Sequence, residues 1–368
     1  MPGSKIYFPA LDALRAIAML FVFAAHLGPV AATVGVGTIW TASPVLGNVG
    51  LILFFVLSGF LITYLLLAEQ KDRRRIDIPR FYLRRILRIW PLYFIIIGIG
   101  QFLIPCTGLF GLDSIYSATA PSFRQASLYY LFFLPNLAFL TVSPVNPLLG
   151  FTWSIGVEEQ FYLIWPLVLR LGRRHLQMIF AVIIALVLWS TWVYIPKISA
   201  VIRWSNMGFF ALGGLMAFFR AKRPDVVIAL STRMTQVVVL LLAVGLIVIR
   251  HLFADGWAAA LLFSLIILHA TQPSTLIGRL RYPWLRYLGR ISYGMYIFHV
   301  LVITLIVRAW GQAGMPATGW RLPLLAFAAT VLAGTLSWYG IERFFLGLKR
   351  RFGSISQTGP KARPRSPS

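Results

Sequence analysis

The sequence predicts an all-α integral membrane protein that crosses the bilayer about ten times, with both termini in the cytoplasm. Of its 368 residues, 59% are hydrophobic and only 12% are charged, and the mean hydropathy is +0.79. A soluble domain carries about 25% charged residues, so the composition excludes an ordinary soluble protein. Runs of about 20 apolar residues, each long enough for a membrane helix, recur along the whole chain.

Apolar stretches separated by short polar connections are expected to form the helices. In chain order they are Leu11–Leu27, Gly47–Ala68, Ile86–Ile104, Ser127–Leu140, Phe151–Leu169, Met178–Tyr194, Trp204–Phe219, Gln236–Ile249, Trp257–Ala270, Ile291–Trp310 and Leu322–Ile341.

Basic residues gather in alternate connections. The net charge of +24 comes from 34 Lys and Arg against 10 Asp and Glu, yet no Lys or Arg lies between Leu27 and Gly47. Cytoplasmic loops carry an excess of Lys and Arg, so the charge is interpreted as a topology signal, and no nucleic-acid partner is expected. The dense groups lie at 71–88, 170–174, 220–233, 279–290 and 343–365.

These groups fall on one side of the membrane only if one stretch does not cross it. Ser127–Leu140 is short and is broken by Pro135–Asn136, so it is predicted to be a re-entrant or short segment. About ten spans remain, within one domain of residues 1–352. The basic segment 353–368, rich in Pro and Ser, is predicted to be a disordered tail.

The first stretch carries Asp12, Arg15 and His26. At 100° per residue, Arg15 and His26 lie within about 20° of one helix face and about 16 Å apart along the axis. Asp12 lies one turn before Arg15 and is expected to pair with it. Ionisable groups at membrane depth are costly and are functional candidates. The alternative is a structural role, in which Arg15 anchors the helix end and His26 is a hydrogen-bonded packing residue.

Two adjacent carboxylates, Glu158 and Glu159, are expected at a depth close to that of His26. Neighbouring residues of a helix point about 100° apart, so only one of them can face a given partner. One of the two is expected to orient or charge-pair the histidine. Alternatively, both carboxylates have a purely structural role and bind polar groups of neighbouring helices.

Arg84, Arg85 and Arg88 lie at the inner mouth of the third stretch and run into the helix. Arginine can bind a phosphate through two parallel hydrogen bonds, so this cluster suits a phosphate-bearing substrate. Anchoring at the cytoplasmic surface is the alternative.

Weaker polar signals lie in two other stretches. Ser58 and Gly59 form a small pair near mid-membrane, which close helix packing would also explain. Ser292, Tyr296 and His299 share a helix face and are expected near the inner half. No metal-binding motif is present, and no metal is expected.

Together these segments resemble the bacterial membrane-bound acyltransferase family 3. The resemblance rests on five motifs in order, which are Leu11–Ala18 followed by His26 (Arg-x10-His), Phe54–Ile62, Arg84–Pro91 with its Arg-x-x-Arg, Thr152–Tyr162, and Ile291–His299. It implies transfer of an acyl group, often acetyl, from cytoplasmic acyl-CoA to a hydroxyl, often on a surface glycan. It also implies residence in the bacterial cytoplasmic (inner) membrane. The chain departs from the family at Ile341–Phe344, where the family often has Pro after the basic residue, and this is expected to concern only the end of the last helix.

The resemblance implies roles for the polar residues. Arg15, Arg84, Arg85 and Arg88 would bind the donor, whose pantetheine arm would run along the first helix toward His26. His26 would act as general base or transient acyl carrier, and Glu158 or Glu159 would stabilise its imidazolium. Acyl-CoA would be a substrate, with no bound cofactor. Supporting roles would fall to Asp12, Ser58, Trp153, Ser154, Tyr293, Tyr296 and His299.

Other classes of function remain open at this stage. A proton-coupled transporter of glycans or small molecules would also use membrane His and carboxylates, but would show inverted repeats. A glycan polymerase or ligase would carry longer outer loops. A scaffold gives no reason for Arg15, His26 and Glu158 at depth. The sequence leaves the acceptor, the acyl group and the oligomeric state open.

Overall fold

The computed structural model describes residues 6–33, 36, 44–104, 120–141, 146–172, 174–192, 206–248, 256–316 and 319–351. Within these ranges every regular element is a helix and no strand occurs, so the predicted all-α class is confirmed. The predicted basic tail, 353–368, lies outside the described residues.

Among the described residues, five helical segments are long and apolar enough to cross a membrane by length and composition, namely Pro9–Thr33, Leu46–Arg73, Ile78–Leu103, Pro283–Gln312 and Arg321–Leu348. They contain α1 (Pro9–Thr33), α2 (Pro44–Arg73), α3 (Ile78–Gly98), α15 (Pro283–Gln312) and α16 (Arg321–Ser337). Further helices, each shorter than these five segments, are α8 (Trp153–Leu171), α9 (Leu176–Trp192), α11 (Met207–Lys222), α12 (Pro224–Ala229), α13 (Arg233–Val248) and α14 (Trp257–Ala270).

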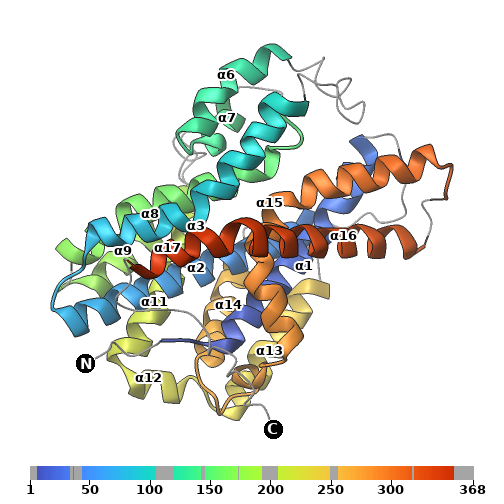
Figure 1. Cartoon of the computed structure of the whole chain (residues 1–368). Coiled ribbons are helices and arrows are strands. Elements are labelled where there is room, and N and C mark those ends of the chain that lie inside the picture. The colour runs from blue at the N-terminus through green and yellow to red at the C-terminus, as the bar shows by residue number, and fades with distance from the viewer. Residues whose placement is uncertain are drawn as a thin grey trace, which may run out of the picture.

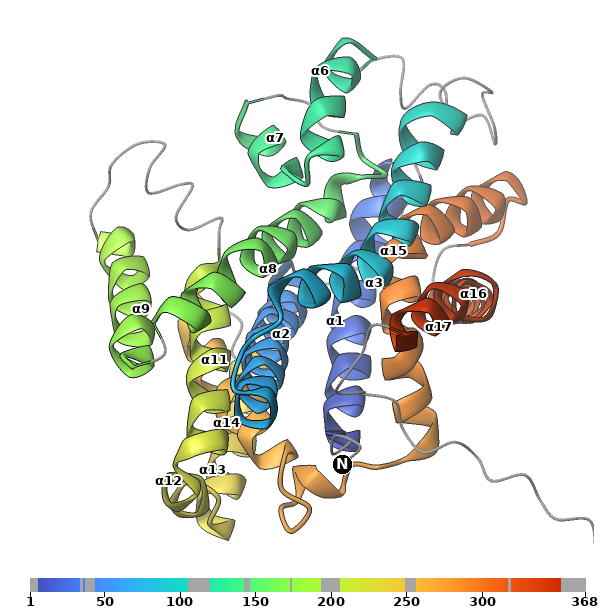
Figure 2. The same ribbon diagram turned by 60° about the vertical axis from the view of Figure 1, so that its left-hand side comes forward.

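The stretch predicted not to cross is broken. Ser127–Leu140 is divided between α6 (Ala120–Leu131) and α7 (Pro135–Thr141). Pro135 begins α7, because proline lacks an N–H group and fits only the first turn of a helix. The two short helices lie together at one end of the molecule, and α1 begins toward the other end (Figures 1 and 2).

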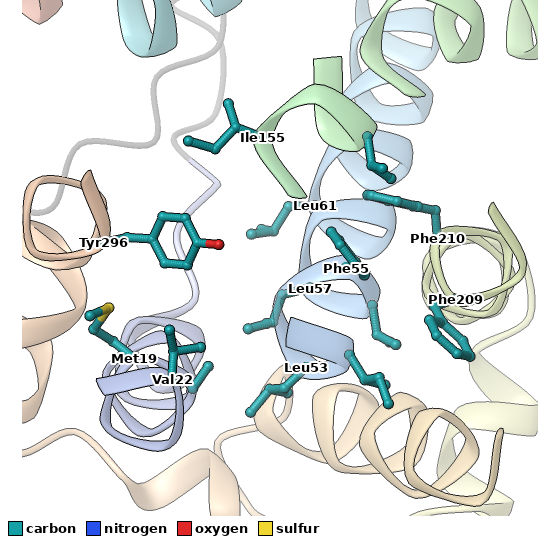
Figure 3. Close-up of a cluster of buried hydrophobic side chains, with 14 of the residues drawn as sticks. Met19, Val22, Leu53, Phe55, Leu57, Leu61, Ile155, Phe209, Phe210 and Tyr296 are labelled. Atoms are coloured by element: carbon teal, nitrogen blue, oxygen red, sulfur yellow. The ribbon is translucent and has the colours of Figure 1, made fainter. Parts of the chain in front are cut away.

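Helix α1 lies at the centre of the bundle. It packs between α2 and α15, and α2 packs in turn against α11 (Figure 2). Apolar side chains fill the space between these helices, among them Met19 and Val22 from α1, Leu57 from α2 and Phe210 from α11 (Figure 3).

The contact between α2 and α11 depends on two glycines. A Cβ added to Gly59 would clash with the backbone carbonyl of Phe210, and one added to Gly213 would clash with the carbonyl of Val56. Small residues allow membrane helices to approach this closely. Gly59 is therefore a packing residue, in agreement with the close helix packing that the sequence offered as an explanation of the Ser58–Gly59 pair.

Two helices pass into π-helical turns. Ile99–Leu103 follows α3, and Trp338–Glu342 joins α16 to α17 (Arg343–Arg351). A π-turn inserts an extra residue and changes the direction in which the following side chains point. The second turn ends at Glu342, which is only 4% exposed.

Candidate active site

His26 and His299 lie side by side in the middle of the bundle. Their ring centroids are 4.8 Å apart in an edge-to-face arrangement. His299 is fully buried and also contacts the rings of Phe151 and Tyr296. The sequence placed His299 nearer the inner surface, because its apolar stretch begins at Ile291. Helix α15 begins at Pro283, which brings His299 to the level of His26.

Hydrogen bonds determine which ring nitrogens carry protons. The Nδ1 atom of His26 lies 2.8 Å from the Val22 carbonyl oxygen, and Nδ1 of His299 lies 2.5 Å from the Tyr296 carbonyl oxygen. A carbonyl can only accept, so both Nδ1 atoms are donors, and in the neutral ring the lone pair is on Nε2. The Nε2 atom of His299 is buried without a hydrogen-bond partner among the described residues. The basic edge of each ring is therefore Nε2.

His26 lines a pocket of about 290 Å³. The pocket lies between α1, α15 and the segment that leads into α8, and Phe151 and Trp153, a predicted supporting residue, form part of its wall. Thr33 and Thr304 also line it, so the wall is mainly apolar with a few hydroxyl groups. A small reactive group entering this pocket would meet the His26 ring.

The two carboxylates of α8 face different helices. Glu158 accepts a 2.5 Å hydrogen bond from the Ser58 hydroxyl on α2, and Glu159 accepts one of 3.1 Å from the Trp90 indole on α3. This differs from the expected pairing with His26, which is bound instead to a carbonyl of its own helix. Adjacent positions of a helix point about 100° apart, which is why the two carboxylates reach different helices.

A second contact joins α8 to α15 one turn before Glu158. The hydroxyls of Ser154 and Tyr296 lie 2.5 Å apart, and the Tyr296 hydroxyl is 3.1 Å from the Phe151 carbonyl. Figure 3 shows the Tyr296 hydroxyl pointing away from α15, toward α2 and α8. These two predicted supporting residues therefore lie between the histidine pair and Glu158.

Three of the four predicted donor-binding arginines have carboxylate partners. Arg15 is 3.0 Å from Asp12, as expected, and Arg84 is 3.1 Å from Glu69. Arg88 is 3.5 Å from Glu342. A role for Arg84 at a phosphate would therefore require its buried ion pair to open.

Arg85 is different, because no carboxylate forms an ion pair with it among the described residues. Its guanidinium lies over the rings of Phe81 and Tyr162, and its Nε is buried without a hydrogen-bond partner there. The Tyr162 hydroxyl is 3.3 Å from Ser58 Oγ, which links this arginine to the Glu158 contact. Arg85 is thus the guanidinium best placed to accept an anion.

Arg88 lies in an aromatic setting. Its guanidinium contacts the faces of Tyr293, a predicted supporting residue, and Trp338. The Tyr293 hydroxyl donates to the Ile89 carbonyl at 2.7 Å, which ties α15 to α3.

Sequence reasoning missed several partners of these groups. Glu69 and Glu342 are 3% and 4% exposed, and each neutralises an arginine of the cluster. The segment that departs from the family, which was expected to concern only a helix end, also contacts the predicted donor site through Glu342. Tyr7 donates to Asp12 at 2.9 Å, and its pKa is raised by burial and then by the Asp12 carboxylate. Glu69 and Glu342 could have been noticed in the sequence, because each is an acidic residue at the end of an apolar stretch.

Within the part of the chain that the structure describes, no three His, Cys, Asp or Glu side chains gather in a way that could hold a metal ion.

Known proteins similar to this chain are named as O-acetyltransferases. The peptidoglycan O-acetyltransferase OatA of Listeria monocytogenes is 27% identical over 92% of this chain and 56% of its own length. The putative peptidoglycan O-acetyltransferase YrhL of Bacillus subtilis is 29% identical over 92% of this chain and 54% of its own. The O-acetyltransferase OatA of Staphylococcus aureus is 27% identical over 96% of this chain and 61% of its own length.

The chain spans a little more than half the length of these relatives. The comparison with solved structures found no match. None of the three relatives is named as a transporter, so they give no support to that alternative. The acyltransferase domain family matches residues 8–341, which is most of the chain. The five motifs and the polar residues gathered around His26 all lie within this match, and the chain therefore belongs to the acyltransferase family.

Proposed function

We propose that this chain is a membrane O-acyltransferase that moves an acetyl group from cytoplasmic acyl-CoA to a hydroxyl of a cell-envelope carbohydrate. The peptidoglycan named in two relatives is the acceptor to test first. The observation that carries the proposal is a line of polar side chains from the arginine cluster to the histidine pair. It passes from Arg85 through Tyr162, Ser58 and Glu158, and then through Ser154 and Tyr296, to His299 and His26.

This line of polar side chains gives the donor a different path from the expected one along the first helix. Between Arg15 and His26 the first helix carries only apolar residues, so the polar groups beside it come from α2, α8 and α15. Arg85 and Arg88, with Arg15, bind the phosphates of the donor at the inner face, and the pantetheine arm extends along this line. The thioester then reaches the pocket beside His26.

In the proposed reaction, the lone pair on His26 Nε2 accepts the proton of the acceptor hydroxyl. The hydroxyl oxygen attacks the thioester carbonyl carbon, the C–S bond breaks, and the CoA sulfur leaves and recovers the proton as a thiol. Alternatively, Nε2 itself carries the acetyl group briefly. Glu158 and Ser58 are positioning residues, and His299 keeps the His26 ring in place.

The proposed topology has ten spans in the bacterial cytoplasmic membrane, with residues 1–352 as one domain and both termini inside. The arrangement of helix ends supports it. The C-terminal ends of α2 and α11 and the start of α9 meet around one pocket that Lys71, Arg174 and Lys222 line. Three of the basic groups expected in the cytoplasm therefore lie together.

The test is transfer of radiolabelled acetyl by the full-length protein in membranes. His26→Ala is expected to lose about 10²–10⁴-fold in rate, the contribution of a general base, while it folds normally. The control is His175→Ala, which changes an exposed histidine outside the site. Near-normal transfer by His26→Ala would reject the mechanism.

Donor binding is tested separately with Arg85→Ala/Arg88→Ala, which is expected to lose binding of acyl-CoA. Unchanged binding would reject the donor site. Mass spectrometry of peptidoglycan and other envelope glycans, from cells with and without the gene, then identifies the acceptor by a lost acetyl mass.

A further inference from the structure

A second pocket, of about 610 Å³, lies at the inner ends of α2, α9 and α11, and the acyl-transfer proposal does not use it. Four cationic side chains line it, namely Lys71, Arg74, Arg174 and Lys222. None of its lining residues is acidic. The pocket therefore concentrates positive charge that nothing in its own wall neutralises.

This arrangement contrasts with the arginine cluster on α3. Arg84 and Arg88 each meet a buried glutamate, whereas the four pocket cations form no ion pair among the described residues. Glu69 is close in sequence to Lys71, but it points toward Arg84 on α3. Like charges around one cavity repel each other, and a bound anion removes that repulsion. Arginine and lysine together are suited to a phosphate.

Apart from Gln70, the rest of the wall is apolar. Leu67, Leu176 and Phe218 line the same pocket beside the cations, so its lining combines charge with hydrocarbon. A free inorganic phosphate would use only the cations. An amphiphile would use both surfaces, with its phosphate among the cations and the start of its acyl chains against Leu67 and Phe218.

The backbone turns sharply at the end of α2, next to this pocket. Arg74 has φ 60°, in the left-handed region that residues other than glycine seldom occupy, and it directly follows the last residue of α2. Such strained positions are often held at functional sites. The turn leaves Arg74 among the residues that line the pocket.

We infer that this pocket binds the headgroup of an anionic phospholipid of the cytoplasmic leaflet. Basic pockets between membrane helices on the cytoplasmic side suit such headgroups. The inference does not depend on the identity of the acyl donor or the acceptor.

The experiment measures bound lipid on the full-length protein by native mass spectrometry after delipidation in detergent. Phosphatidylglycerol and the zwitterionic phosphatidylcholine are added back at equal concentration. The pocket variant is Lys71→Gln/Arg74→Gln/Arg174→Gln/Lys222→Gln. Its affinity for phosphatidylglycerol is expected to fall at least tenfold, because each cation near an anionic headgroup contributes a severalfold factor.

The control removes the same charge elsewhere, with Arg73→Gln/Arg75→Gln/Arg279→Gln/Arg290→Gln, four exposed residues that do not line the pocket. It should bind phosphatidylglycerol within twofold of the unmodified chain. Equal losses in both quadruple variants would overturn the assignment, because they would reflect net charge alone.

Two further measurements keep the result interpretable. Lys71→Arg/Lys222→Arg keeps the charge and should keep the lipid, and its loss of binding would contradict a charge-based site. Coenzyme A is then added as a competitor. If it displaces the lipid, and the pocket variant loses coenzyme A binding as well, the site belongs to the nucleotide phosphates and the lipid assignment fails.

Discussion

Replacing Gly59 by alanine should separate α2 from α11. The added Cβ would clash with the Phe210 carbonyl oxygen and lie 2.7 Å from the Phe210 Cα atom, whereas ordinary contacts begin at 3.4 Å, so the backbones must move apart by more than about 0.7 Å. Overpacking of this kind costs about 1–3 kcal/mol. The gain in helix propensity from glycine to alanine returns about 1 kcal/mol at most. We therefore expect a net loss of up to about 2 kcal/mol in the free energy of unfolding.

Gly98→Ala is the matched control. Gly98 lies in α3, and a Cβ there meets no atom within 4 Å, so only the gain in propensity applies. Reversible unfolding in mixed micelles, followed by tryptophan fluorescence against increasing SDS, measures both variants. The propensity gain is common to both variants, so the two should differ by the overpacking cost of about 1–3 kcal/mol. If Gly59→Ala is as stable as Gly98→Ala, the close approach of the two helices is not real.

Three further predictions concern single contacts. Arg84→Ala leaves Glu69 buried and unpaired and should destabilise the chain by about 3–5 kcal/mol in the same unfolding assay; a smaller loss than for Gly59→Ala would contradict a buried pair. Trp90→Phe removes the only hydrogen-bond donor to Glu159 among the described residues and should cost about 1–3 kcal/mol, whereas no change would mean that water replaces the indole. His299→Phe keeps an aromatic ring and removes both the buried unpaired Nε2 and the Nδ1 donor to the Tyr296 carbonyl, so stability should change by about 1 kcal/mol or less while acetyl transfer slows at least tenfold; full transfer would exclude a role beside His26.

The helices could be predicted from the sequence, because a backbone in lipid must satisfy its own hydrogen bonds and long apolar stretches therefore become helices. The break at Pro135 followed from the chemistry of proline. The Asp12–Arg15 pair was also predictable, since its geometry depends only on positions within one helix.

Contacts between helices were harder to predict. An apolar stretch does not show how its helix is rotated, so the partners of Glu158 and Glu159 could not be read from their neighbours in sequence. The pairing of Arg88 with Glu342 joins α3 to the last π-turn and required the folded chain. The depth of His299 was misjudged for a simpler reason, because polar residues at the start of α15 concealed its first two turns.

The π-turn at Trp338–Glu342 controls the register of the C-terminal helix. A π-turn carries one residue more than the α-helical turn it replaces, so every later side chain is rotated by about 100°. Removing a single residue from this turn would restore a continuous α-helix and swing Glu342 away from Arg88. A one-residue deletion far along the chain would thereby unmask a guanidinium on α3. The charge of the inner arginine cluster thus depends on the length of this segment as well as on its composition.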